Sequence, residues 1–272
     1  LALNATNAPI DASRVYFAGH SLGAIAGTAF TAVANTPMEG PLAPASALFT
    51  VNGSSFMAPG ASVANFLLAS GSFGPVIKSQ LLYSQNPQFA AAVNSAAEAQ
   101  GVGPADPAFQ AVMNAVFDQF WAGLSDAQQA SINAVFEQFA FAAQTVIDSA
   151  DPINYASTVV ATETPIHLIE VVGDGGASLP DQVIPNAVPN KPLAGTEPLI
   201  AALKLEAISA TYASSDGTPV SGAVRFIAGD HASIVSPAAS PAATQEMQTQ
   251  TAFWFATDNT VIPVQNPTVV KQ

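Results

Sequence analysis

The stretch that decides the fold runs from Arg14 to Phe30 and reads RVYFAGHSLGAIAGTAF. Its first five residues favour a β-strand and its last seven favour a helix, with Gly19-His20-Ser21-Leu22-Gly23 between them. A Gly-x-Ser-x-Gly sequence in this setting is typical of a sharp, strained turn that exposes a serine above the end of a sheet. The two glycines are expected to give the turn clearance. We therefore expect Ser21 to be a nucleophile, and the alternative is an ordinary Gly/Ser turn.

The composition limits the classes of protein to which the chain can belong. Of its 272 residues, 49% are hydrophobic and 9% are charged, and the net charge is −13. This excess of acidic groups argues against nucleic acid and anionic lipid as partners. The sequence contains no uninterrupted apolar run of about 18 residues, so we expect a soluble protein with an apolar surface patch. Cysteine is absent, so neither disulfides nor thiol chemistry are expected.

Patterns along the rest of the chain indicate strands that alternate with helices. Expected strands cover 14–18, 47–51, 165–172 and 222–227, and expected helices cover 24–30, 106–121, 125–147, 197–208 and 244–256. Apolar residues at helical spacing support the second of these helices, and a possible capping box from Ser125 to Gln128 marks the start of the third. The alternation predicts an α/β fold with a mostly parallel sheet flanked by helices.

The same patterns divide the chain into three parts. Residues 1–59 contain the nucleophile strand, the serine turn and the following strand of the core. Residues 60–150 form a helical insertion, and residues 151–272 complete the core and contain the acid and the base. The insertion is either a structural cap or a lid over an acyl-binding cleft, and either would shield a site from water.

A serine nucleophile needs a base, usually histidine, and this chain has three histidines. His231 follows the last expected strand, where the base lies when the chain order is serine, acid, histidine. The His20 side chain should point away from Ser21 into neighbouring structure. His167 lies within an apolar strand, so we expect a buried, hydrogen-bonded core histidine there. We therefore expect His231 to be the base.

The acid should follow the penultimate strand and precede the base. Asp181 and Asp174 both satisfy this order, and we favour Asp181. Asp174 stands before a glycine, and Asp-Gly is a favoured turn pair, so it is the alternative acid. Asp151 precedes the strand, and Asp230 adjoins the base and would more plausibly cap a turn.

Four segments together resemble a known family. They are Gly19-His20-Ser21-Leu22-Gly23, Val-Ile-Asp-Ser-Ala-Asp-Pro-Ile-Asn-Tyr at 146–155, Asp181-Gln182-Val183-Ile184-Pro185 and Gly229-Asp230-His231. In this order they are similar to the C-terminal catalytic half of bacterial extracellular lipases of the virulence-factor type, in the α/β-hydrolase superfamily. The resemblance extends from residue 12 to about residue 257. It implies hydrolysis of acyl esters by Ser21, Asp181 and His231, no metal and no cofactor, and a secreted or cell-surface location.

One expected part of such an enzyme has no counterpart in the sequence. The oxyanion hole takes one N–H from Leu22, and the second normally comes from a loop between earlier strands. Only 20 residues precede Ser21, so we expect the early strands and that loop to be missing from this chain. The chain could be one product of a nicked precursor, a fragment, or a minimal hydrolase with rearranged strands. We favour the first two, with the N-terminal half of the precursor as a separate chain or a missing segment.

The sequence therefore predicts a serine hydrolase that cleaves carboxylic esters through an acyl-enzyme, with an ester or lipid as substrate. A polyester hydrolase or a phospholipase would share the same residues. A different class of protein, a surface-binding module on a catalytically incomplete hydrolase, is the remaining alternative. A serine peptidase is less favoured.

Overall fold

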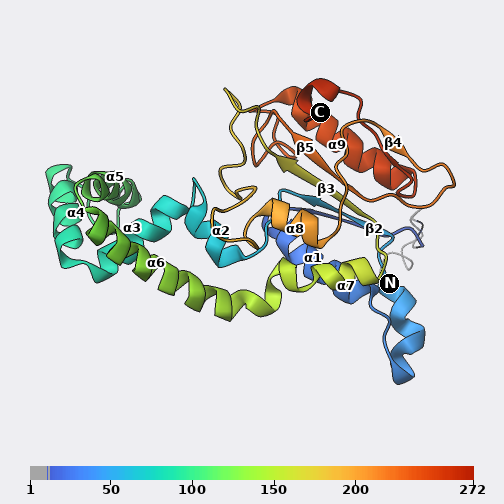
Figure 1. Cartoon of the computed structure of the whole chain (residues 1–272), viewed down its shortest axis with the longest axis horizontal. Coiled ribbons are helices and arrows are strands. Elements are labelled where there is room, and N and C mark those ends of the chain that lie inside the picture. Colours follow the sequence, from blue (N-terminus) through green and yellow to red (C-terminus); the bar gives the residue numbers. More distant parts are fainter. Residues whose placement is uncertain (1–10, 12) are drawn as a thin grey trace.

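The computed structural model describes Asp11 and residues 13–272, and its fold is α/β (Figure 1). One sheet contains, in spatial order, β1 (Tyr16–His20), β2 (Gly53–Met57), β3 (Ile166–Val171) and β5 (Gly222–Phe226). Each neighbouring pair is parallel. The predicted class, a parallel sheet flanked by helices, is confirmed. Because parallel strands end at the same edge of a sheet, the loops after β1, β3 and β5 meet there.

Helices cover both faces of this sheet. α1 (Leu22–Asn35), α7 (Ala156–Ala161) and α8 (Thr196–Ala202) lie on one face, and α9 (Pro241–Ala256) lies on the other (Figure 1). Neighbouring residues of β3 enter different cores, because side chains alternate along a strand. Leu168 packs in the core beneath α1 and α8, and Ile169 packs in the core that contains Trp254 of α9. The site-bearing edge therefore belongs to a sheet that is held from both sides.

The second strand lies later in the chain than its sequence pattern suggests. The strand predicted at 47–51 is wrong, because Gly40–Leu48 form an exposed 3₁₀ helix, η2. The true strand is β2, and it begins in residues that resemble a turn in the sequence. All five of its residues are buried.

Hydroxyl pairing explains why a buried strand contains small polar residues. The hydroxyls of Thr31 and Ser54 lie 2.7 Å apart, and Ser55 Oγ lies 3.0 Å from His167 Nδ1. These contacts satisfy hydroxyl groups that would otherwise be costly to bury. A polar composition that signals a turn in isolation is therefore compatible with the middle of this sheet.

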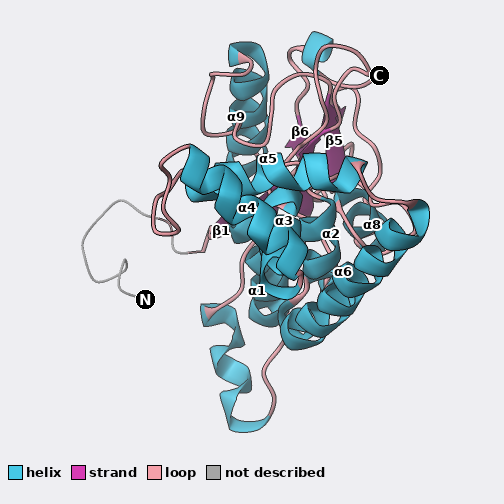
Figure 2. Ribbon diagram, turned by 90° about the vertical axis from the view of Figure 1, so that its left-hand side faces the viewer, coloured by secondary structure: helices cyan, strands magenta, loops and turns pink. Residues whose placement is uncertain are grey.

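The helical insertion between β2 and α7 contains five α-helices. They are α2 (Val63–Ala69), α3 (Gly74–Gln85), α4 (Pro87–Ala99), α5 (Phe109–Ala122) and α6 (Asp126–Ile147). Helices α3, α4, α5 and part of α6 enclose a hydrophobic core of their own, which includes Phe89, Phe117 and Phe136. The long helix α6 connects this core to the rest of the molecule (Figures 1 and 2).

The starts of two of these helices test the capping predictions. The capping box at α6 is confirmed, since the Ser125 N–H donates to Gln128 Oε1 at 3.0 Å and the helix begins at the next residue. The start predicted for α5 at Asp106 is too early. Asp106 Oδ1 accepts the N–H of Ala108 at 2.8 Å in a turn, and α5 begins at Phe109.

The remaining elements are short. They are β4 (Tyr212–Ala213) and β6 (Val261–Ile262), which pair antiparallel, and the 3₁₀ helices η3 (Asp148–Ala150), η4 (Pro152–Asn154) and η5 (Pro267–Val269). Helix α8 ends before its predicted end at residue 208, and Lys204 has a φ of 54°, which a helix does not accommodate. Among the described residues, no helix has both the length and the apolar character to cross a membrane.

Candidate active site

Ser21 lies on the tight connection between β1 and α1. β1 ends at His20 and α1 begins at Leu22, so a single residue makes the turn, with φ 54° and ψ −122°. A positive φ is unfavourable for a residue with a Cβ and is typical of strained functional sites, at a cost of about 1–3 kcal/mol. The turn is held by the Ser21 N–H, which donates to the Met57 carbonyl at 2.9 Å. The backbone therefore fixes the direction of the serine side chain.

The two glycines of the motif have unequal roles. A Cβ on Gly19 would lie 2.5 Å from the carbonyl oxygen of Gly23 and 2.7 Å from Phe17 Cε1, so only glycine fits there. A Cβ on Gly23 would meet nothing within 4 Å. The expectation that both glycines supply clearance is wrong for Gly23. The glycine that the sequence argument overlooks is Gly27, where a Cβ would lie 2.3 Å from Phe17.

The structure brings Ser21, His231 and Asp181 together in one hydrogen-bonded chain. Ser21 Oγ lies 2.8 Å from His231 Nε2, and His231 Nδ1 lies 2.6 Å from Asp181 Oδ2. Ser21 follows β1, Asp181 follows β3 and His231 follows β5, so the common edge of the parallel sheet assembles residues up to 210 positions apart. This is the geometry that a nucleophile, a base and an orienting acid require.

The surroundings of Asp181 hold its carboxylate in place. The side chain is buried, and its second oxygen, Oδ1, accepts the N–H groups of Val183 at 2.8 Å and Ile184 at 3.0 Å. The Asp181 N–H donates to the Val171 carbonyl at the end of β3. Because the carboxylate accepts from His231, the imidazole proton lies on Nδ1 and Nε2 is free to accept from the serine hydroxyl.

Asp174, the alternative acid, is placed in its own turn. Its Oδ1 accepts the N–H groups of Gly176 at 2.7 Å and Ser178 at 3.0 Å. These backbone hydrogen bonds lower the pKa of the Asp174 carboxyl below its usual value. The side chain thus has the turn role that its Asp-Gly sequence suggests, and the histidine contact belongs to Asp181.

Asp151 and Asp230 also have backbone partners. Asp151 is buried and accepts the N–H groups of Ser62 and Val63 with its two oxygens. It therefore anchors the start of α2 to the core. Asp230 Oδ1 accepts the Ala232 N–H at 3.0 Å and so shapes the turn next to the base, as predicted.

His167 is a buried core residue, as predicted. Its Nδ1 lies 3.0 Å from Ser55 Oγ, and its ring centroid lies 5.6 Å from that of Trp254. Burial lowers the pKa of His167 to about 4, so the ring is neutral near pH 7.

His20 contacts the loop of the base, which the sequence did not indicate. The expectation that it points into neighbouring structure is correct, and that structure is the His231 backbone. His20 Nε2 donates to the His231 carbonyl at 2.7 Å, and the two ring centroids are 5.0 Å apart. A carbonyl only accepts, so the His20 proton must lie on Nε2. His20 thus connects the serine turn directly to the base.

A buried carboxyl group anchors the loop that follows the acid. Glu170 of β3 accepts from Asn186 Nδ2 at 2.6 Å, and Arg225 Nε lies 3.1 Å from its other oxygen. Arg225 also forms a two-point ion pair with Glu197 at the start of α8. Burial, together with the negative charge of Glu197, raises the pKa of Glu170 to about 8. This network therefore attaches Asn186, in the loop after Asp181, and Glu197, in the first turn of α8, to the sheet.

The surface beside Ser21 is open. In the described part of the chain β1 pairs with β2 alone, so it forms the edge of the sheet. Leu22, whose N–H begins α1, is 73% exposed, and Val15, which directly precedes β1, is 45% exposed. The first N–H groups of a helix lack partners within the helix, so the Leu22 N–H is available to an oxyanion at Ser21.

Two hollows adjoin His231. One, of about 10 Å³, lies behind the base among residues that include Met57 and Met247, and it is too small for a substrate. The other, of about 580 Å³, lies between the loops of the acid and the base. This volume is within the range of small-molecule sites.

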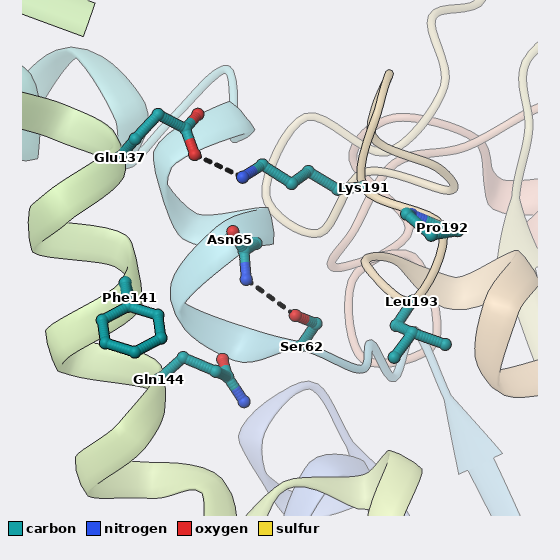
Figure 3. Close-up of a pocket in the computed structure, with 8 residues that line it drawn as sticks. All are labelled: Ser62, Asn65, Glu137, Phe141, Gln144, Lys191, Pro192 and Leu193. Carbon is teal, nitrogen blue, oxygen red and sulfur yellow. Dashed lines mark hydrogen bonds and ion pairs between the residues drawn. The ribbon is translucent and has the colours of Figure 1, made fainter. Parts of the chain in front are cut away.

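A further hollow of about 350 Å³ lies between α2, α6 and the loop before α8 (Figure 3). Lys191 of that loop forms an ion pair with Glu137 of α6 across the hollow (Figure 3). Asn65 Nδ2 of α2 donates a hydrogen bond to Oγ of Ser62, the residue before α2 (Figure 3). Its lining contains no histidine and none of the three residues of the hydrogen-bonded chain. It lies at the junction between the helical insertion and the core.

No group of three or more His, Asp or Glu side chains suitable for a metal ion is present among the described residues. Comparison with known proteins returned no match: no family model, no curated protein and no solved structure is significantly similar to the chain.

Proposed function

We propose that the protein is a serine hydrolase that cleaves carboxylic esters through an acyl-enzyme. One observation carries this proposal, the chain of hydrogen bonds from Ser21 Oγ through His231 to Asp181, at 2.8 Å and 2.6 Å. The strained backbone of Ser21 and the helix that begins at Leu22 support the same reading.

Each residue then has a definite step. His231 Nε2 takes the proton of Ser21 as its oxygen attacks the ester carbonyl, and the Leu22 N–H stabilises the oxyanion. Nε2 next gives this proton to the departing alkoxide, which leaves Ser21 esterified. Water, deprotonated by His231 Nε2, attacks the carbonyl carbon of the acyl-enzyme. His231 then returns this proton to Ser21 Oγ as the bond between Oγ and the acyl carbon breaks and the carboxylic acid leaves. Asp181 orients the imidazole and stabilises its charged form in both halves of the cycle.

We extend the proposal to the α/β-hydrolase fold family and to a lipase or esterase of a secreted or cell-surface type. The order serine, acid, histidine and the position of each residue after a parallel strand support it. A polyester hydrolase or a phospholipase would use the same three residues.

The open edge of β1 supports a second part of the proposal, that a further polypeptide segment completes the sheet. Among Asp11 and residues 13–272, β1 has no strand partner on this side, and an edge next to exposed Val15 and Leu22 is a surface on which another strand would pair. Such a segment, an N-terminal half of the same precursor, would lie where the second oxyanion donor is needed. A protein that contains both this N-terminal segment and residues 1–272 should hydrolyse an ester faster than residues 1–272 alone. Equal rates for the two proteins would contradict the proposal that a further segment completes the sheet.

Replacement of the nucleophile tests the proposed reaction. Ser21→Ala should lower kcat for a short-chain ester by roughly 10³-fold or more, because nothing replaces the acyl-accepting oxygen. The measurement is initial rate of hydrolysis with purified wild-type and variant protein, with circular dichroism as the control for folding. Ester hydrolysis that persists in the folded variant would contradict the assignment of Ser21 as the nucleophile. Absence of both hydrolysis and serine labelling in the wild type would favour a binding module instead.

A further inference from the structure

The larger hollow beside His231 is built by three loops. They are the loop between α2 and α3, the loop after β3 that contains Asp181, and the loop after β5. Its lining includes Ser72, Ala177, Leu179, Val183, His231 and Ala239. Most of the lining side chains are small or apolar, so they leave the volume of about 580 Å³ open to a ligand.

The walls of this hollow are fixed by backbone contacts. The Ser72 N–H donates to the Gln182 carbonyl at 2.9 Å, which attaches the helical insertion to the acid loop. Asp174 holds the segment 174–178 with its two accepted hydrogen bonds. Gly173 has a φ of 69°, and a Cβ there would lie 2.4 Å from the Ser178 carbonyl oxygen. The hollow is therefore a shaped site rather than a gap between free loops.

The proposed reaction places the alcohol portion of the ester on the side of His231 where this hollow lies. Nε2 of His231 must reach the leaving oxygen, so the alcohol portion of the ester lies next to His231. The acyl carbon is bonded to Ser21, which does not line this hollow. The space behind the base is only about 10 Å³ and cannot hold an alcohol group.

Building on the proposed function, we propose that this hollow binds the alcohol portion of the ester and that this alcohol is uncharged. The lining contains one ionisable carboxylate, Asp230, and no lysine or arginine. A phosphate on the alcohol would therefore face a carboxylate without a cation to balance it, which is unfavourable in a partly enclosed site. The substrate class is thus the ester of a neutral alcohol, with room for a group larger than methyl.

A steric variant tests the position of the alcohol. Ala239 is exposed, so Ala239→Trp should fold and narrow the hollow. It should lower kcat/KM for a benzyl ester relative to the methyl ester of the same acid by roughly tenfold. Ratios between short and long acyl groups at constant alcohol should not change. The matched control is Ala92→Trp on the exposed side of α4.

A charge variant tests the preference for a neutral alcohol. Ala177→Lys adds a cation to the lining, and it should raise kcat/KM for the ester of a phosphorylated alcohol relative to its neutral analogue. An unchanged benzyl-to-methyl ratio in Ala239→Trp, or a change that follows acyl length, would overturn the assignment of the hollow. Efficient wild-type hydrolysis of the phosphorylated ester would overturn the neutral preference. Failure of the wild type to hydrolyse even the methyl ester and to react with a serine probe would instead remove the proposed function, and this inference with it.

Discussion

At the scale of single residues, the two aspartates after β3 have separable roles. Asp181 contacts His231 Nδ1 at 2.6 Å, whereas Asp174 holds its own turn. Asp181→Asn should lower kcat by roughly 10³–10⁴-fold, because an amide does not favour the required imidazole tautomer. Asp174→Asn should leave methyl-ester hydrolysis within about tenfold of wild type, since it affects only a turn. Steady-state kinetics on both variants decide the matter, and a larger loss in Asp174→Asn would reverse the assignment.

His20 is predicted to act as a positioning residue through the His231 backbone. Its Nε2 donates to the His231 carbonyl at 2.7 Å. His20→Ala should lower kcat by roughly ten- to hundredfold with little change in KM, because the base loop loses a fixed contact. Glutamine can donate from a similar position, so His20→Gln should restore much of the rate. Equal losses in the two variants, or a loss confined to KM, would exclude this role.

The sequence predicted the three residues of the hydrogen-bonded chain because each lies in a local pattern. Ser21 lies in a strand–turn–helix motif, and Asp181 and His231 follow recognisable strands. The contact made by His20 has no local signature, since its partner is 211 positions away. The buried network of Glu170 was missed for the same reason. An isolated glutamate in an apolar strand does not reveal which arginine or amide will face it.

At the scale of elements, the separate core of the helical insertion makes a prediction. Phe136 of α6 is buried against Phe117 and Trp121 in that core. Phe136→Ala should destabilise the insertion by about 3–5 kcal/mol, because it leaves a cavity. Amides of α3, α4 and α5 should exchange faster with deuterium, while those of β3 should change little. Phe141→Ala, on the same helix but 77% exposed, is the matched control and should leave both regions unchanged. Equal acceleration in β3 would mean that the two cores unfold as one unit.

The strand β2 was predicted at the wrong residues because its composition does not show that it is buried. Residues 47–51 have the apolar composition of a strand, yet Ala47 and Leu48 are the end of the exposed 3₁₀ helix η2, whereas Gly53–Met57 are buried. A polar composition indicates an exposed segment only if its polar groups would lack hydrogen-bond partners in the core. Here hydroxyl groups on neighbouring elements pair with one another, as Thr31 and Ser54 do. Helices α5 and α6 were predicted more closely because their periodicity and capping are local properties.

At the scale of the whole molecule, stability should depend on pH through His167. Its pKa is about 4 in the folded protein, against 6.5 for an ordinary histidine. Between pH 4 and pH 6.5 the unfolded chain binds more protons at this residue than the folded protein does. The contribution of His167 to the free energy of unfolding is therefore complete above pH 6.5 and falls as the pH drops toward 4. The free energy of unfolding lost through this residue is about 3 kcal/mol. Urea unfolding at a series of pH values should show this fall in wild type and a smaller one in His167→Gln. An equal pH dependence in both proteins would assign it to other groups.

Also at this scale, the proposed activity requires that the hydrogen bonds from Ser21 through His231 to Asp181 make Ser21 reactive. The most direct measurement is reaction with a fluorophosphonate, followed by peptide mass spectrometry to locate the adduct. We predict a single adduct on Ser21 in the wild type, none in Ser21→Ala, and a strongly reduced labelling rate in His231→Ala and Asp181→Asn. Labelling of Ser21 at the same rate after loss of His231, or an adduct on another residue, would contradict the central claim.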